Sequence, residues 1–383
     1  MKILYWTSQF WPDIGGIEIL AMRTLPPLAD RGYQFLVVTS HGRSEQPDFM
    51  EYQGIPVQRF PFWSALTKND VPLILKILKQ IADLKLTFKP DLIHFNFSGY
   101  TAFYQVATAR NHPTPTLISL HSDLTGLRTG PGTTVGKLFQ LADWVTAVSK
   151  STLESARETI PGIIGRSSVI YGCAEEIKMV LAPLSFNPAC ILGIGRLTYE
   201  KGFDLLLDAI SLIVDRYPNL SIKIIGDGPE RASLEQQTIK LRLIDKVELM
   251  GNISNDDIPK YINAACLVVV PSRYQEPFGI VAVEAALMAR PVVAANVGGL
   301  AEIVVNNETG LLVEMENSRA FADAIVAILA QPEKTIRMGL AGRLRVQKEF
   351  NLAKYVDAYD MLYQQMATNQ FPMTGVRLDE NAD

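Results

Sequence analysis

One stretch of the chain decides its fold: VVVPSRYQEPFGIVAVEAALMARPVVAANVGG, residues 268–299. The run Leu267–Val270 is short, apolar and β-branched, which predicts a strand buried on both faces. The Ala/Val/Leu/Met pattern of Ile280–Arg290 predicts a helix that Pro291 stops. Val292–Ala295 then predicts the next parallel strand, so the stretch forms a β–loop–α–β unit.

This unit carries two carboxylates. Glu276 lies in the loop beside the predicted helix N-terminus, whose unpaired N–H groups suit an anion or sugar hydroxyls. Glu284 lies on an otherwise apolar helix, where a charge is costly unless a polar group meets it. An ordinary explanation stays open, because acidic residues are common in the first turns of helices.

The whole string favours a functional site. Pro-Ser at the strand end, Glu-Pro-Phe-Gly in the loop and the Glu-x7-Glu spacing closely resemble the donor-site signature of the retaining glycosyltransferases of family 4. The resemblance implies that Glu276 lies near the donor sugar and Glu284 on the nucleotide ribose. It also implies that the N–H groups of Phe278, Gly279 and Ile280 face sugar and phosphate.

Length and composition limit the possible classes. The chain has 383 residues, 48% of them hydrophobic, which indicates two domains. A net charge of −4 gives no general attraction to nucleic acid. The three cysteines include no C-x-x-C pair, so we expect neither disulfides nor a zinc site. We find no signal-peptide pattern and no apolar run of about 20 residues, and expect a cytoplasmic protein.

Strands alternate with helices, which predicts an α/β fold with parallel sheets. We expect two facing Rossmann-like domains, the GT-B arrangement, with the active site in the interdomain cleft. Residues 1–172 would form the acceptor-binding domain and 189–350 the nucleotide-sugar-binding domain, joined by a linker at 173–188. We expect a helix at residues 351–368, which could return to the first domain. We expect a disordered tail at residues 369–383.

A second glycine-bearing loop carries two cations. It runs from Gly193 to Gly202 and contains Arg196 and Lys201. Ligands of α/β domains bind at the carboxyl ends of strands, and both cation types suit phosphate. Surface cations of a solvated loop are the alternative. The string Gly-Arg-Leu-x-x-x-Lys-Gly resembles the family's diphosphate-binding loop, which implies that Arg196 and Lys201 neutralise the leaving nucleoside diphosphate.

The first half of the chain offers two further candidates. Gly15 and Gly16 follow the first predicted strand; they could form a turn that needs positive φ, or a loop that lets a ligand touch backbone. The resemblance favours donor phosphates there. His121 follows a buried strand, where a lone histidine is often structural. The string Ser-Leu-His resembles the family's active-site histidine, which implies contact with the donor sugar near its sixth carbon.

The sequence lacks the glycine patterns of two rival nucleotide-binding motifs. A Rossmann fingerprint needs G-x-G-x-x-G, but Thr198 and Arg231 occupy the required third positions, and no P-loop is present. A nicotinamide-dependent oxidoreductase is therefore disfavoured. Gly226 ends a strand and would border the nucleotide by resemblance, although a bare turn would also use it. The resemblance further places the main chain of Ile253 beside the base.

The predicted reaction needs no metal or cofactor besides the donor. No Asp-x-Asp occurs in the chain, although clustered oxygen ligands are what a hard cation requires. By resemblance the chain transfers a sugar from a UDP- or GDP-sugar to a hydroxyl of a glycan, glycolipid or small molecule, with retention of configuration. A catalytically silent nucleotide-sugar binder is the remaining alternative.

Residues 59–89 suggest peripheral contact with a membrane, at its inner face. Basic residues beside exposed aromatics and an amphipathic helix are typical of such contacts. The opposing explanation is a Rossmann helix whose lysines face water. The stretch contains the cations Arg59, Lys68, Lys76, Lys79, Lys85 and Lys89, the acids Asp70 and Asp83, and the aromatics Phe60, Phe62 and Trp63.

Overall fold

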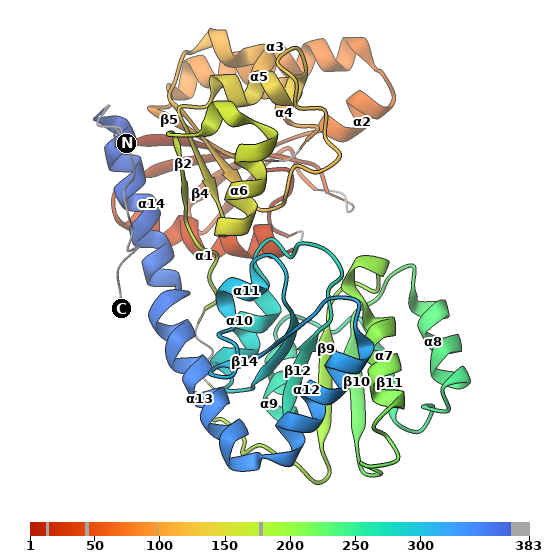
Figure 1. Ribbon diagram of the computed structural model, residues 1–383. Coiled ribbons are helices and arrows are strands. Elements are labelled where there is room, and N and C mark those ends of the chain that lie inside the picture. Colours follow the sequence, from red (N-terminus) through yellow and green to blue (C-terminus); the bar gives the residue numbers. More distant parts are fainter. Residues whose placement is uncertain (13–14, 43–45, 98, 176–178, 369–383) are drawn as a thin grey trace. The chain divides into compact units, whose positions relative to one another are not determined.

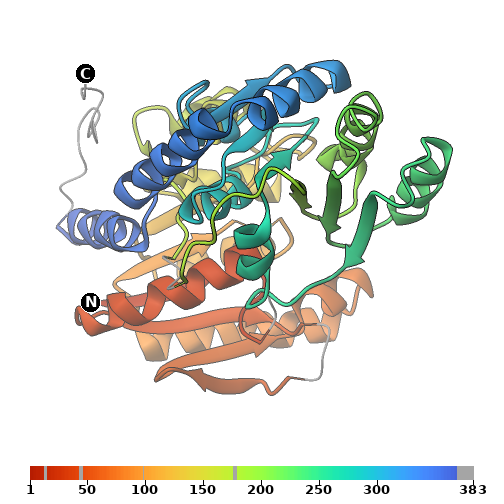
Figure 2. The same cartoon turned by 90° about the horizontal axis from the view of Figure 1, so that it is seen from below.

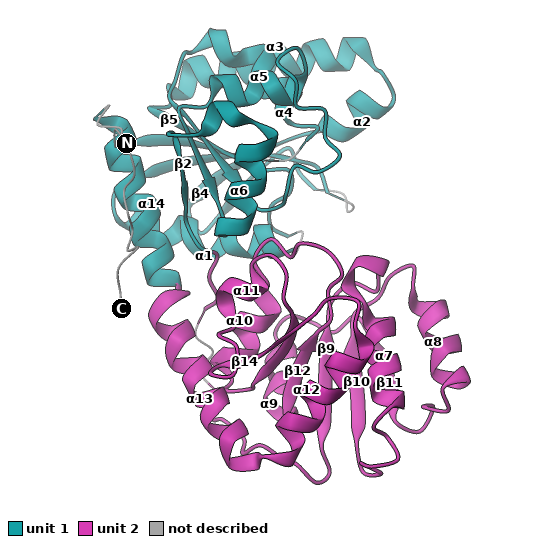
Figure 3. Ribbon diagram, viewed as in Figure 1, with its two compact units in different colours: residues 1–171, 352–383 teal, residues 172–351 magenta. Residues whose placement is uncertain are grey.

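The computed structural model describes residues 1–12, 15–42, 46–97, 99–175 and 179–368. It divides into two compact units, residues 1–171 with 352–383, and residues 172–351 (Figure 3). The predicted tail at 369–383 lies outside the described residues.

The first unit is built on an eight-stranded sheet with the strand order β3-β4-β2-β1-β5-β6-β7-β8 (Figure 1). Its strands are β1 (Lys2–Trp6), β2 (Gln34–Ser40), β3 (Phe49–Tyr52), β4 (Ile55–Phe60), β5 (Leu92–Asn96), β6 (Thr116–Leu120), β7 (Trp144–Ala147) and β8 (Ser167–Val169). Its helices are α1 (Gly16–Asp30), α2 (Phe62–Thr67), α3 (Val71–Phe88), α4 (Ala102–Thr108), α5 (Thr134–Leu141), α6 (Lys150–Thr159) and α14 (Leu352–Ala367), with 3₁₀ turns at Ala109–Asn111 and Pro161–Ile163.

One pairing in this sheet departs from the predicted parallel arrangement. Strand β3 pairs antiparallel with β4, while the other described pairs of the sheet are parallel. Gln53 and Gly54 both have positive φ between the two strands, as a two-residue hairpin requires. The hairpin therefore adds an edge strand that the hydrophobic pattern did not reveal.

The second unit is built on a six-stranded sheet with the order β11-β10-β9-β12-β13-β14, in which the described pairs are parallel. Its strands are β9 (Cys190–Ile194), β10 (Ser221–Ile225), β11 (Val247–Gly251), β12 (Leu267–Val270), β13 (Val292–Ala295) and β14 (Gly310–Val313). Its helices are α7 (Phe203–Ser211), α8 (Arg231–Lys240), α9 (Ile258–Ala264), α10 (Ile280–Leu287), α11 (Leu300–Ile303), α12 (Ser318–Ala330) and α13 (Pro332–Glu349), with a 3₁₀ turn at Tyr199–Lys201.

Helix α1 runs unbroken through Pro26 and Pro27, although two prolines inside a helix predict a kink or a split. Figure 2 shows this helix, coloured red, along the first sheet. Thr24 donates from Oγ1 to the carbonyl oxygen of Leu20 at 2.6 Å, a side-chain bond that supports the turn before the prolines. The two prolines therefore do not split the helix.

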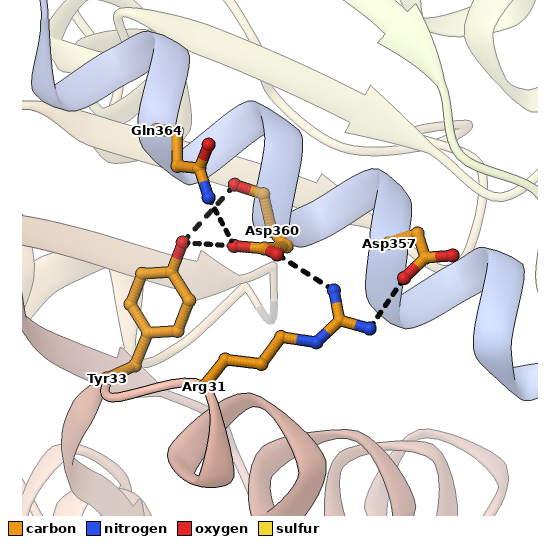
Figure 4. A network of polar contacts seen from close by, with 5 residues as sticks. All are labelled: Arg31, Tyr33, Asp357, Asp360 and Gln364. Carbon is orange, nitrogen blue, oxygen red and sulfur yellow. Dashed lines mark hydrogen bonds and ion pairs between the residues drawn. The ribbon is translucent and has the colours of Figure 1, made fainter.

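Helix α14 belongs to the first unit and is tied to it by charged and polar contacts (Figure 4). Arg31, just after α1, contacts Asp357 at 2.5 Å and Asp360 at 2.8 Å. Tyr33 donates to Asp360 Oδ1, which also accepts from Gln364 at 2.9 Å. The last helix of the described residues therefore belongs to the same unit as α1.

A buried polar cluster lies beneath α14. His94 on β5 contacts the hydroxyl of Tyr363 at 2.5 Å and that of Ser119 at 2.7 Å. Ser119 in turn contacts Thr146 at 2.8 Å and Tyr359 at 2.9 Å. Burial, with a smaller effect from His121, lowers the pKa of His94 to about 3, so its ring is neutral near neutral pH.

The stretch 59–89 is less exposed than its sequence suggested. Arg59 and Lys85 are buried, and so are Phe60 and Phe62. Lys85 lies four residues after Ile81, on the inward side of α3. Its ammonium donates to Gln105 Oε1 and to Thr108 Oγ1, each at 2.8 Å, and to the carbonyl oxygen of Thr108 at 3.2 Å. These four residues are unavailable to a membrane.

Candidate functional site

The candidate site begins at the carboxyl edge of the second sheet. Strand β9 lies between β10 and β12, so the loop after β9 and the loop after β12 are neighbours. The first of these loops contains Arg196 and Lys201, and the second contains Glu276. The topology therefore brings together two motifs that lie 75 residues apart in the sequence.

Lys201 and Glu276 form an ion pair. The ammonium nitrogen lies 2.8 Å from Oε1 and 2.7 Å from Oε2 of the carboxylate. Ser272 Oγ donates to Oε2 at 3.0 Å, which fixes the orientation of the carboxylate. The side chains keep 31% and 16% exposure, so the pair is desolvated in part and still reachable by a ligand. An ammonium has three N–H donors, and two of them are used here.

Two glycines, Gly298 and Gly299, contact the main chain of Glu276. The N–H of Gly299 donates to the carbonyl oxygen of Glu276 at 2.7 Å. Gly298 has a φ of +50°, and a Cβ at that position would lie 2.4 Å from the same carbonyl oxygen. Backbone contact this close leaves no room for a side chain, so the glycine pair acts as scaffold for the carboxylate.

Arg273 is a positioning residue that sequence reasoning missed. Its guanidinium lies 2.6 Å and 2.5 Å from the two carboxylate oxygens of Asp204 and 3.0 Å from the carbonyl of Tyr199. The bonds to Asp204 raise the pKa of Arg273. It thereby fixes the turn that precedes Lys201 against the β12 loop. A charged residue three positions after the end of a buried strand was the available signal.

Arg196 and Thr198 occupy the start of the β9 loop. Arg196 is exposed, and its loop is tied to the β10 loop by a bond from the N–H of Leu197 to the carbonyl of Asp227 at 3.0 Å. The buried hydroxyl oxygen of Thr198 has no hydrogen-bond partner among the described residues. A buried hydroxyl without a partner is costly, which marks this loop as a place where a ligand could bind.

Helix α10 begins at the same edge. Gly279 is its N-cap, with a φ of +99°, and no side chain among the described residues caps the helix there. Phe278 is buried and packs edge-on against Phe350 at 5.7 Å, whereas Ile280 is partly exposed. Glu284 lies half-buried one turn further along. The helix start therefore offers backbone N–H groups next to Glu276.

Gly226 and Ile253 follow the two strands on the other side of β9. The N–H of Gly226 donates to the carbonyl of Gly251 at 2.8 Å, and that of Gly195 donates to Ile225 at 3.0 Å. A Cβ on Gly226 would lie 1.9 Å from the carbonyl oxygen of Gly195, so packing alone explains this glycine. Ile253 is half-buried in the loop after β11.

His121 belongs to the first unit. It follows β6, and its Nε2 lies 3.0 Å from Asn96 Oδ1. Burial lowers the pKa of His121 to about 4, so a neutral ring donates to Asn96 and leaves Nδ1 as its acceptor. His121 also borders a narrow cavity of about 10 Å³, room for about one water molecule. The other lining residues include His94, Thr24, Tyr355, Tyr359 and Tyr363.

Gly15 and Gly16 form the start of α1. Gly15 is extended, with a φ of −156°, and neither glycine has positive φ. The explanation as a turn that needs positive φ is therefore wrong. A Cβ on Gly16 would meet nothing within 4 Å, so the backbone is open to a ligand at that position.

Neither a cluster of metal ligands nor a membrane-spanning helix is found among the described residues. In the part of the chain that the structure describes, no group of three or more His, Cys, Asp or Glu is placed to hold a metal ion. Among the same residues, every helix is too short or too polar to cross a membrane.

Comparisons with known proteins agree with this architecture. Residues 14–173 match the family model described as Glycosyltransferase Family 4, and residues 183–345 match the one described as Glycosyl transferases group 1. The chain is 39% identical to an uncharacterised glycosyltransferase of Methanocaldococcus jannaschii over 360 residues, which cover 86% of this chain and 89% of the relative.

Solved structures share the fold. The Anabaena protein HepE in complex with UDP aligns with a TM-score of 0.77 at 24% identity, covering 95% of this chain and all of that one. Sucrose-phosphate synthase from Thermosynechococcus elongatus aligns with a TM-score of 0.78 at 23% identity, covering 96% and 99%. The fold is thus that of the GT-B glycosyltransferases, and the chain belongs to the glycosyltransferase family of the group 1 and family 4 type.

Proposed function

We propose that this chain transfers a sugar from a nucleoside diphosphate donor, a UDP- or GDP-sugar, to an acceptor hydroxyl with retention of anomeric configuration. The ion pair between Lys201 and Glu276 carries the proposal, because it sets a cation for diphosphate beside a carboxylate for sugar hydroxyls. The fold likeness to HepE, which is solved with UDP and with UDP-glucose, supports this donor class.

The second unit supplies the donor site in this proposal. Lys201 and Arg196 neutralise the diphosphate as the bond to the sugar breaks, and Thr198 offers a further polar contact. Glu276 accepts hydrogen bonds from sugar hydroxyls, and Glu284 from the ribose. The N–H groups at Phe278, Gly279 and Ile280 face sugar and phosphate, while Gly226 and Ile253 border the nucleotide.

The first unit supplies the acceptor site and part of the donor contacts. A neutral His121 accepts a hydrogen bond from a donor-sugar hydroxyl, and the backbone of Gly15 and Gly16, which is open at Gly16, approaches the phosphates. The acceptor is a hydroxyl of a glycan, glycolipid or small molecule. The leaving phosphate takes the acceptor proton, so the protein acts by position and by electrostatic stabilisation.

We further propose that the reaction requires neither a metal nor a cofactor besides the donor, and that the chain works in the cytoplasm at the inner face of a membrane. The cations Arg196 and Lys201 replace a metal in charge neutralisation. Activity that disappears with EDTA and returns with Mn²⁺ or Mg²⁺ would refute metal independence.

A two-step assay tests the function. A thermal-shift screen of nucleotide sugars identifies the donor, because a ligand that binds only the native state stabilises it by mass action. That donor is then incubated with candidate acceptors in EDTA while release of the nucleoside diphosphate is followed. We expect both stabilisation and acceptor-dependent release. Stabilisation without release would indicate a silent binder, and stabilisation by NAD alone an oxidoreductase.

A further inference from the structure

The outer side of helix α3 carries apolar side chains where a surface helix ordinarily carries polar ones. Leu75 and Leu86 are 61% and 50% exposed. The half-buried Leu78 and Ala82 lie between them, and the spacings of three and four residues put all four on one side of the helix. A different stripe, which includes Ile77, packs into the core.

Helix α2 contacts α3 (Figure 1), and it adds an exposed aromatic ring. Trp63, the second residue of α2, is 58% exposed, although Phe62 and Ala65 of the same helix are buried. Its ring meets Tyr100 edge-on at 5.2 Å, so it is held in place while its remaining surface faces solvent. A tryptophan with one packed side and one open side suits the boundary between water and an apolar phase.

Cations accompany these apolar residues. Lys68, just after α2, and Lys76 and Lys79 on α3 are exposed. Of the two nearby acids, Asp70 is the N-cap of α3 and accepts from the N–H of Leu73 at 3.0 Å, so its charge is engaged with the helix start. The chain as a whole has a net charge of −4. A basic surface on an acidic chain therefore favours an anionic partner.

We propose that the α2–α3 face, defined by Trp63, Leu75, Leu86, Lys68, Lys76 and Lys79, docks onto an anionic lipid bilayer. Apolar side chains enter the boundary between headgroups and acyl chains, while the lysine ammoniums stay among the anionic headgroups. A face with both features fits a bilayer better than it fits a free anion, which would leave the leucines in water. The inference extends the proposed function, on which it rests, by naming a bilayer that presents a lipid-linked acceptor.

Co-flotation of the full chain with vesicles tests this inference. Vesicles of phosphatidylcholine alone are compared with vesicles that contain about one third phosphatidylglycerol, at low salt and in 0.5 M NaCl. We expect binding to the anionic vesicles at low salt, at least tenfold weaker binding to the neutral ones, and loss in high salt because the headgroup attraction is screened. Failure to bind the anionic vesicles at low salt would overturn the proposal.

Matched variants locate the contact. We expect Lys76→Glu/Lys79→Glu and Leu75→Ser/Leu86→Ser each to weaken vesicle binding at least tenfold. Ile239→Ser/Ile244→Ser is the apolar control, since these residues of the second unit are 61% and 60% exposed. Lys240→Glu/Lys334→Glu is the charge control on exposed lysines. Equal binding by test and control variants would refute the assignment to this face.

Two further readouts separate the possible failures. The thermal shift given by the donor is measured for every variant; we expect it to be unchanged, because the altered side chains are exposed and none of them belongs to the proposed donor contacts. Loss of vesicle binding with an intact donor shift supports the bilayer contact. If the wild type floats with no vesicle but forms dimers that Leu75→Ser/Leu86→Ser abolishes, the face belongs to a second copy of the chain and the proposal is wrong.

Discussion

The two units hold their polar clusters in opposite electrostatic states. In the second unit Lys201 and Glu276 are charged and partly open to solvent. In the first unit His94 is buried and His121 is half-buried, and their lowered pKa values keep both rings neutral among hydroxyl and amide groups. The contrast is what the proposed function requires, in which a diphosphate meets its counter-charges in the second unit and the first unit offers neutral hydrogen-bonding groups.

The largest expected effect follows from removing a cation of the second unit. Lys201→Ala and Arg196→Ala should each lower turnover by about 2–4 kcal/mol of transition-state stabilisation, the size expected for one electrostatic donor at developing charge. Steady-state kinetics with the donor measure the loss.

Lys223→Ala is the matched control, because Lys223 has a similar side-chain exposure of 35% and its ion pair with Glu248 lies on the strands themselves. Losses below tenfold in both test variants, or an equal loss in the control, would remove the assignment to diphosphate.

A smaller effect should follow from neutralising the carboxylate. Glu276→Gln keeps the shape and weakens both the ion pair with Lys201 and the acceptance of sugar hydroxyls, so turnover should fall by about 2 kcal/mol. The melting temperature should change little, because a partly exposed ion pair contributes little to stability. A large fall in the melting temperature, together with normal turnover by the enzyme that remains folded, would show that Glu276 has a structural role instead.

The smallest expected effect concerns the neutral cluster. The pKa of His94 falls from 6.5 in the unfolded chain to about 3 in the folded one, so its contribution to stability is present above pH 6.5 and is lost as the pH falls toward 3. Between pH 6.5 and 5.5 the loss should be about 1 kcal/mol. Urea unfolding at both pH values measures this loss.

His94→Gln should lose that part of the pH dependence, and His41→Gln, on a partly exposed histidine, should keep it. Identical pH dependence in the wild type and His94→Gln would show that the cluster does not hold His94 neutral.

Sequence predicted the second unit better than the first for a physical reason. Continuous apolar runs such as Leu267–Val270 identify buried parallel strands, and a loop motif such as the one around Glu276 stands directly after its strand. Contacts across the sheet carry no such local signal. The role of Arg273 depends on Asp204, 69 residues away, and could not be seen in either motif.

The first unit shows where local patterns mislead. Lys85 looks like a surface cation and Leu86 like a core residue, yet the lysine is buried and the leucine exposed. Position on the helix explains the difference. Lys85 lies on the same side of α3 as Ile77 and Ile81, which face the core, whereas Leu86 lies on the same side as the exposed Leu75. The buried ammonium is stabilised by Gln105 and Thr108 of α4, which no pattern within α3 could reveal.

Calorimetric titration of nucleoside diphosphates, in EDTA, tests the central claim most directly, because it needs neither an acceptor nor turnover. Wild-type protein and Lys201→Ala are titrated with UDP, GDP and NAD. The account predicts that UDP or GDP binds the wild type without a metal, that Lys201→Ala binds it more than tenfold more weakly, and that NAD gives no binding heat. Binding of neither diphosphate, or equal affinity in the variant, would contradict a cationic donor site at the carboxyl edge of the second sheet.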